Sequence, residues 1–128
     1  MPETIYQQIL RTISWRALVT WGLVAFFVFA GLLNIFAPVS LVEDYQRWGY
    51  PGWFHYATGS LELLSAFLQA RRATSKAGVV LAASVMGVAV ITLLIYHEWL
   101  HAPFPLLIFV TLSAKLIPAV QRSLQPSN

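Results

Sequence analysis

The stretch AGVVLAASVMGVAVITLLIYH, residues 77–97, contains no acidic or basic side chain apart from its final histidine. About 20 apolar residues in a helix cross the ~30 Å hydrocarbon core of a bilayer. Three further blocks have a similar apolar character, at residues 17–42, 53–70 and 103–120. In lipid a single segment pairs its backbone groups internally only as a helix, and short connections favour antiparallel neighbours. The sequence therefore predicts an all-α fold, an antiparallel bundle of four transmembrane helices forming one domain over residues 1–128.

The composition favours lipid over water as the solvent of this fold. The chain is 58% hydrophobic and 10% charged, with a mean hydropathy of +0.66, whereas ordinary globular domains carry about 25% charged residues. The absence of cysteine excludes disulfide, thiol-nucleophile, iron–sulfur and thiolate–zinc chemistry within the chain. The net charge of +3 is modest, and we expect no nucleic-acid partner.

The distribution of basic residues predicts the orientation. They precede the first block, fill the connection between the second and third, and follow the fourth: Arg11, Arg16, Arg71, Arg72, Lys76 and Arg122. Positively charged connections mark the cytoplasmic side of a membrane protein. We therefore predict a multi-pass protein of the cell's inner (plasma) membrane with both termini in the cytoplasm.

Two features are typical of a membrane interface. In residues 1–16, Ile5, Ile9 and Ile13 recur at helical spacing beside polar residues, which favours a short interfacial helix over a frayed terminus. Aromatic residues gather at the predicted helix ends, as in an interfacial belt: Trp15, Trp48, Tyr50, Trp53, Tyr56, Tyr96 and Trp99.

The residue least expected in this sequence is Glu62, near the middle of the block 53–70. A charged side chain at that depth costs at least ~2.5–3.5 kcal/mol on insertion scales. At about 1.5 Å per residue, Asn34 lies at a depth similar to that of Glu62 and is a candidate partner. Lys115 lies deeper from the outer side; its long side chain either extends toward Glu62 or turns to the cytoplasmic face.

One face of the block 53–70 is small and polar along its length, at i, i+3, i+4 and i+7 spacing: His55, Thr58, Gly59, Glu62, Ser65, Ala66 and Gln69. Such a face marks a helix–helix contact or a cavity wall in membranes. Two interpretations stay open. In one, the face packs against a neighbour and a neutral Glu62 bonds to Asn34 or to a backbone carbonyl. In the other, Glu62, Asn34, Lys115, Thr58 and Ser65 form a polar pocket or proton-handling site, with His55 and His97 at its rim.

The segment HEWLH, His97–His101, matches the H-E-x-x-H pattern of zinc peptidases. On a helix its two histidines would share a face, with Glu98 as general base. The match is short, Pro103 follows two residues later, and the third ligand would have to be His55 or a carboxylate such as Glu43 or Asp44. We therefore expect no metal site, and keep metal binding by His97 and His101 as a remote alternative.

With these residues in view, the chain resembles the DoxX-like family of small four-helix membrane proteins. The resemblance covers roughly residues 17–120 and is carried by FVFAGLLNIF in the first block, RWGYPGWFHYATGSLELLSAF from Arg47 onward, and the YH that closes the third block. Its most diagnostic part is Gly49-Tyr50-Pro51 followed by Gly59-Ser60-Leu61-Glu62-Leu63. The resemblance implies a four-helix membrane bundle and an association with redox chemistry, since the family takes its name from a subunit of a thiosulfate–quinone oxidoreductase. One departure is Asn34, where many relatives are expected to carry lysine.

Three functional hypotheses follow. The first is an accessory or quinone-interacting subunit of a redox system, in which a quinone or a partner subunit carries the electrons. The second is a non-catalytic module that binds or transports a small lipophilic molecule. The third is a stand-alone enzyme, either a metal-dependent hydrolase using HEWLH or an isomerase using Glu62. An accessory role is favoured over an enzyme, and the expected partners are the lipid bilayer, a redox subunit and further copies of the chain.

Overall fold

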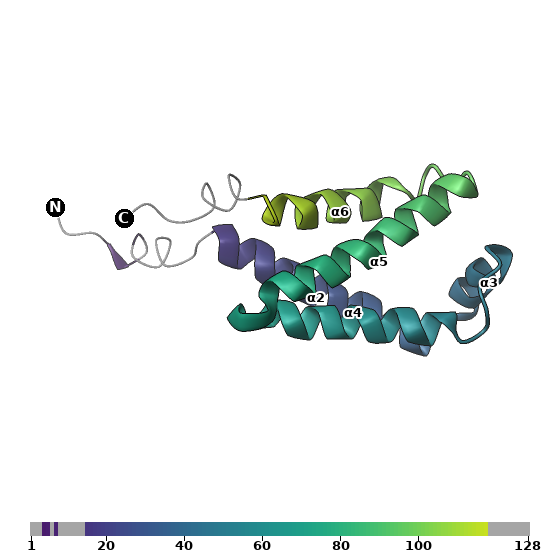
Figure 1. Cartoon of the computed structure of the whole chain (residues 1–128), viewed down its shortest axis with the longest axis horizontal. Coiled ribbons are helices and arrows are strands. Elements are labelled where there is room, and N and C mark those ends of the chain that lie inside the picture. Colours follow the sequence, from purple (N-terminus) through teal and green to yellow (C-terminus); the bar gives the residue numbers. More distant parts are fainter. Residues whose placement is uncertain (1–3, 6, 8–14, 118–128) are drawn as a thin grey trace.

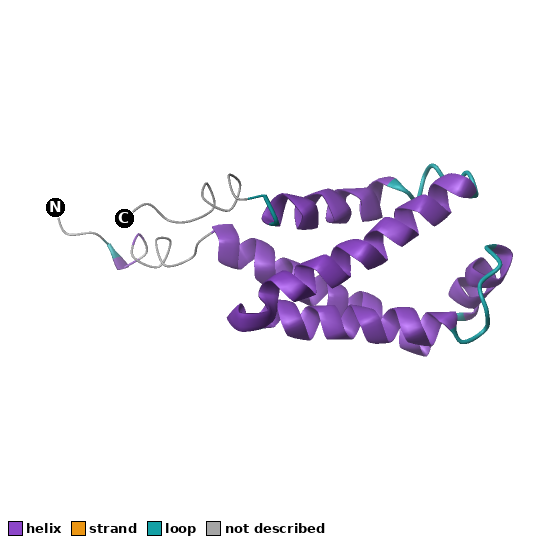
Figure 2. Cartoon of the chain, in the orientation of Figure 1, coloured by secondary structure: helices purple, strands orange, loops and turns teal. Residues whose placement is uncertain are grey.

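The computed structural model describes residues 4, 5, 7 and 15–117, and this part of the chain is helical without any strand (Figures 1 and 2). The elements are α2 (Trp15–Phe36), α3 (Val39–Arg47), α4 (Phe54–Ala70), the short 3-10 helix η1 (Arg72–Thr74), α5 (Ser75–Ile95) and α6 (Pro103–Lys115). The interfacial helix predicted within residues 1–16 falls almost entirely outside the described residues.

The four longer helices follow one another in an antiparallel series. α2 packs against α4, α4 against α5, and α5 against α6. In Figure 1, α4 and α5 lie close together near η1 and diverge toward the opposite end, where α3 lies. The start of α2, η1 and the end of α6 therefore share one end of the bundle, and α3 and the turn after α5 share the other.

Glycine permits the close crossing of α2 and α4. A Cβ atom on Gly31 would lie 2.9 Å from the carbonyl oxygen of Gly59, and one on Gly59 would lie 2.7 Å from the carbonyl oxygen of Gly31. Backbones approach this closely in helical membrane proteins only where both residues are small. The crossing brings Asn34 and Glu62, each about one turn from the glycine of its own helix, within hydrogen-bond distance of each other.

The core is a narrow apolar cluster where all four longer helices meet, made of Leu23, Phe27, Ala66, Val79, Ala82, Met86 and Leu112. Many large apolar side chains lie on the outer surface instead, including Phe29, Leu64, Phe67, Ile91 and Leu107. Within the described residues, two helical segments are long and apolar enough to cross a membrane, Trp15–Phe36 and Arg72–Ile95. The helices α4 and α6 are shorter, with 17 and 13 residues.

The predicted helix over residues 17–42 is wrong at its end. α2 ends at Phe36, and the chain restarts as the separate helix α3 after Pro38. Proline has no N–H to continue the helical ladder and disfavours helical geometry in the residue before it. The other bounds shift less: α4 begins one residue later than predicted, α5 covers 75–95 instead of 77–97, and α6 ends at Lys115. The predicted residues 118–120 of the last helix lie outside the described residues.

Candidate functional site

Glu62 is buried, with 3% of its surface exposed, and the predicted contact with Asn34 is present. The Asn34 Nδ2 donates to both carboxyl oxygens of Glu62, at 3.2 and 3.3 Å, and to the carbonyl oxygen of Ala30 at 3.0 Å. The Tyr45 hydroxyl donates to the Asn34 Oδ1 at 2.6 Å. A continuous hydrogen-bonded chain, Tyr45–Asn34–Glu62, thus links α3, α2 and α4.

Tyr45 is a neutral hydrogen-bond donor in this series of hydrogen bonds. Desolvation by burial raises its pKa to about 12, more than the hydrogen bond with Thr58 lowers it. The phenol therefore remains protonated across the physiological range. Its ring contacts those of Trp48, Tyr50 and Phe54 edge to face, at centroid distances of 5.8, 6.0 and 5.5 Å.

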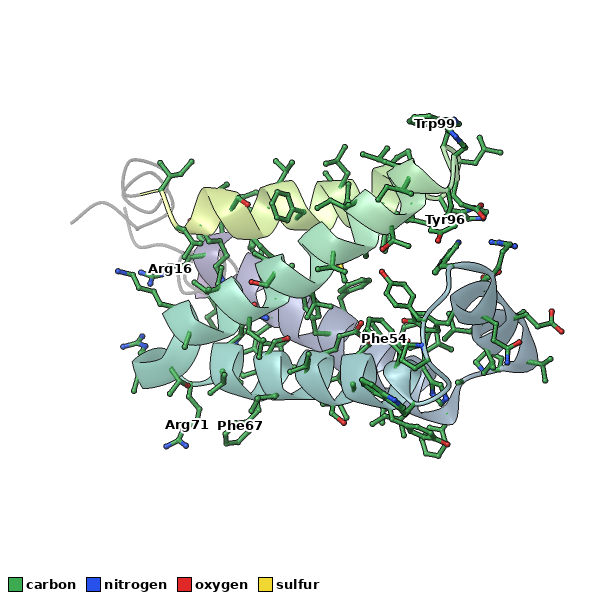
Figure 3. The ribbon with its side chains drawn as sticks, turned by 45° about the vertical axis from the view of Figure 1, so that its right-hand side comes forward. Arg16, Phe54, Phe67, Arg71, Tyr96 and Trp99 are labelled. Atoms are coloured by element: carbon green, nitrogen blue, oxygen red, sulfur yellow. The ribbon has the colours of Figure 1, made fainter. Side chains whose placement is uncertain are left out.

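A cavity of about 270 Å³ opens beside the hydrogen-bonded side chains of Tyr45, Asn34 and Glu62. It lies between α4 and α5, where these helices diverge toward α3. Its aromatic wall consists of Tyr45, Trp48, Tyr50 and Phe54, the last labelled in Figure 3. The α5 side supplies Ser84, Val85, Met86, Val88, Ala89, Thr92 and Leu93, and α4 supplies Thr58 and Glu62. The lining is mainly apolar with a few polar groups, as in sites for small lipophilic molecules.

The segment after α3 is tied to the end of α5 on one side of this cavity. The Tyr50 and Thr92 hydroxyls lie 2.5 Å apart, and the Tyr96 hydroxyl donates to the Trp48 carbonyl oxygen at 3.0 Å. Arg47 and Glu98 form an ion pair nearby. Gly49 has a φ of +79°, a conformation that favours glycine. With Pro51 it shapes the turn that directs Tyr50 toward α5, which gives the Gly49-Tyr50-Pro51 motif a structural role.

The structure brings some predicted site residues to the cavity and places others nearby. Thr58 lines the cavity and donates to the Phe54 carbonyl oxygen at 3.0 Å. Ser65 is buried, does not line the cavity, and donates to the Glu62 carbonyl oxygen at 2.8 Å. His55 is not at a rim: it is buried, and its Nδ1 lies 2.8 Å from the Asn34 carbonyl oxygen. His55 therefore joins α4 to α2 at the level of the Asn34–Glu62 contact.

Lys115 lies at the other end of the bundle. Its Nζ donates to the Thr20 Oγ1 at 2.9 Å, so it does not approach Glu62. Of the two orientations considered for Lys115, the structure shows the one directed away from the middle of the helices. No lysine therefore compensates for Asn34 standing beside the carboxylate.

The HEWLH segment is not helical. α5 ends at Ile95, and His97 is an exposed turn residue with a φ of 59°. Glu98 pairs with Arg47 and lies 3.2 Å from the His101 Nδ1. Within residues 4, 5, 7 and 15–117, no three metal-ligating side chains cluster. The shared helical face that a zinc peptidase requires does not exist, and His97 does not line the cavity.

Sequence reasoning missed Tyr45, Trp48, Tyr50 and Thr92 as cavity residues. The sequence pattern predicts an interfacial belt for Trp48 and Tyr50, although Tyr45, Trp48 and Tyr50 fall in one short segment beside the glycine–proline turn. Thr92 is one of only two serine or threonine residues in the block 77–97, and the other, Ser84, also lines the cavity. Isolated hydroxyls in an apolar helix were the available signal.

These features define the class of the protein: a small helical protein with exposed apolar helix surfaces and a polar contact buried between its helices. The model of the DoxX-like family matches residues 18–115, and the chain belongs to that family. No curated protein and no solved structure was found to match the chain.

Proposed function

We propose that the chain is a four-span protein of the cell's inner (plasma) membrane, with both ends on the cytoplasmic side. The antiparallel series of helices and their exposed apolar side chains support this arrangement. α4 has 17 residues, which at about 1.5 Å per residue reach roughly 25 Å. Arg16, Arg71, Arg72 and Lys76 all lie at the end of the bundle where α2 begins, as expected for a cytoplasmic face.

The cavity between α4 and α5 is the proposed binding site for a small lipophilic molecule that carries hydrogen-bonding oxygen atoms, such as a quinone. The observation that carries this proposal is a buried carboxylate at the wall of an aromatic, mainly apolar cavity. Phe54 and Tyr50 are stacked at 4.0 Å, and the four aromatic side chains offer faces and edges to a flat ring. The Thr58 hydroxyl and the Glu62 carboxyl supply the polar contacts that would orient the ligand.

Within a redox system, this chain would act as an accessory subunit. Asn34 fixes the Glu62 carboxyl from one side, and Glu62 is part of the cavity wall. In that position Glu62 can hold a hydrogen bond to a ligand oxygen, or exchange a proton with it. A bound quinone would supply the electron-carrying group, and a partner subunit its reductant.

A second candidate is a module that binds or transports a lipophilic molecule without chemistry. It is supported by the lining, which contains one carboxyl group and no histidine, lysine or arginine. A single carboxyl beside two tyrosines offers few groups for acid–base catalysis.

Binding of a short-chain quinone to the full chain in mild detergent tests the proposal. We expect native mass spectrometry to show one bound decylubiquinone, and quenching of Trp48 fluorescence to give the affinity, with a Trp48→Phe variant identifying that signal. Ala89→Phe, which fills the cavity from α5, and Glu62→Leu should each weaken binding at least tenfold. Val80→Phe is the matched control, because Val80 is an exposed residue of α5 outside the cavity.

Unchanged affinity in Ala89→Phe would overturn the site. Absence of quinone binding together with a co-purified lipophile that Ala89→Phe removes would favour the second candidate.

A further inference from the structure

A second cavity, of about 230 Å³, lies at the end of the bundle opposite α3. The start of α2, the η1–α5 junction and the end of α6 converge on it. Its lining consists of Arg16, Thr20, Arg72, Ala73, Ser75, Lys76, Val79, Lys115 and Leu116. This cavity is distinct from the proposed quinone site and shares no residue with it.

Four of these lining residues are cationic and none is acidic. The acidic residues that the structure describes lie elsewhere: Glu62 within α4, and Glu43, Asp44 and Glu98 at the α3 end. Cations gathered around one cavity repel each other, and an anion in the cavity relieves that repulsion. The arrangement therefore selects for a negatively charged occupant.

Hydrogen-bond donors accompany the charges. Thr20 accepts from the Lys115 Nζ at 2.9 Å, which fixes that ammonium group at the cavity wall. Ser75 begins α5, and its neighbour Thr74 does not cap the helix, because the Thr74 hydroxyl donates to the Leu68 carbonyl oxygen at 2.8 Å. The first N–H groups of this 21-residue helix therefore add partial positive charge beside Lys76.

We infer that this cavity binds the phosphate group of an anionic membrane lipid. Arginine and lysine with hydroxyl donors match the charge and geometry of phosphate oxygens. The apolar residues Val79 and Leu116 line the same cavity, and the neighbouring helix surfaces are apolar, which suits a headgroup attached to acyl chains. Basic pockets between membrane helices on the cytoplasmic side bind anionic headgroups in this way.

The experiment measures lipid binding by the full chain in nanodiscs of phosphatidylcholine, with phosphatidylglycerol added in increasing proportion. Native mass spectrometry of the released protein counts the phosphatidylglycerol molecules retained. We expect one retained molecule in the wild type, and weaker retention in Arg16→Gln, Arg72→Gln and Lys76→Gln, by roughly fivefold for each cation removed. These residues are exposed, so the substitutions should leave the fold intact.

Arg71→Gln is the matched control, since it removes the same charge from the same end of the bundle. Arg71 does not line the cavity: its guanidinium lies 5.7 Å from the centre of the Phe67 ring, and Figure 3 shows the two side by side, away from Arg16. Retention in Arg71→Gln should equal that of the wild type. Equal loss in Arg71→Gln and Arg72→Gln would overturn the site, because it would show attraction to the general charge of this end.

Two further arms distinguish the source of the phosphate. In nanodiscs of pure phosphatidylcholine, the lipid headgroup has a phosphate but no net charge. If the protein retained phosphatidylcholine there as strongly as it retains phosphatidylglycerol, the requirement for an anion would be overturned. Displacement of phosphatidylglycerol by an equal concentration of inorganic phosphate would overturn the lipid assignment in favour of a free phosphate. None of these results depends on what occupies the cavity beside Glu62.

Discussion

The two ends of this bundle accommodate polar groups in opposite ways. Beside α3, the side chains of Tyr45, Asn34 and Glu62 bond to one another, and only one of them is an acid. At the other end, four cations surround a cavity whose lining contains no acid. The α3 end pairs its polar groups with one another, whereas at the other end Lys115 bonds to Thr20 and the exposed Arg16, Arg72 and Lys76 face solvent or a ligand.

This difference follows from depth. A polar group in the interior of a membrane helix must find its partner within the protein, because an unpaired one costs several kcal/mol in hydrocarbon. Cations at a helix end reach water and lipid headgroups, and long side chains extend the distance over which they do so. The hydrogen bonds among Tyr45, Asn34 and Glu62, the interior contact, therefore depend on exact helix register. The basic end, where Arg16, Arg72, Lys76 and Lys115 lie, tolerates some movement of its side chains.

The largest expected effect comes from breaking the helix crossing that sets this register. Gly31→Val should lower the free energy of unfolding by about 3 kcal/mol, because its Cβ would lie 2.7 Å from the Leu63 Cγ and 2.9 Å from the Gly59 carbonyl oxygen. Titration with SDS in mixed micelles measures this. Gly22→Val in the same helix is the control: no atom lies within 4 Å of its Cβ position, and we expect a change within about 0.5 kcal/mol.

Glu62→Ala is expected to have the next largest effect. It leaves the Asn34 amide without its carboxyl partner in a buried position, and should cost about 2 kcal/mol of stability. Glu62→Gln retains an acceptor oxygen for the Asn34 Nδ2 and should cost less than half as much. The same SDS titration compares the two, and an equal, severe loss in both would show that the interior contact depends on a charge.

Much of this arrangement follows from the sequence. The small polar face of residues 55–69 is the face that α4 buries, because helical spacing alone places His55, Gly59, Glu62 and Gln69 together. Depth counted along the helices paired Asn34 with Glu62. Both inferences depend only on helix geometry, which a membrane enforces strongly.

The features that the sequence did not predict depend on where the helices end. The break at Pro38 creates α3, and α3 carries Tyr45 back to Asn34. The end of α5 at Ile95 removes the helical geometry that HEWLH needed. Tertiary contacts of short connecting segments decide such positions, and a single sequence does not encode them in its periodicity.

Tyr45→Phe tests how much the connecting segment contributes to the interior contact. It removes the hydroxyl that donates to the Asn34 Oδ1 and keeps the ring contacts, so it should cost about 1 kcal/mol. Tyr56→Phe is the matched control, since Tyr56 is exposed on α4. Equal stabilities of Tyr45→Phe and the wild type would confine the interior contact to Asn34 and Glu62.

The smallest effect is expected at the ion pair of Arg47 and Glu98, which joins α3 to the turn after α5. The Arg47 side chain is 55% exposed and also lies 3.2 Å from Asp44, so solvent screens its interaction with Glu98. A double-mutant cycle with Arg47→Met and Glu98→Gln should give a coupling energy of about 0.5 kcal/mol that falls at high salt. A salt-insensitive coupling above about 2 kcal/mol would contradict this, because it would require a desolvated pair. In that case the Arg47–Glu98 pair would stabilise the fold because solvent is excluded from it. The α3 end and the basic end of the bundle would then differ only in how deeply their charged groups are buried.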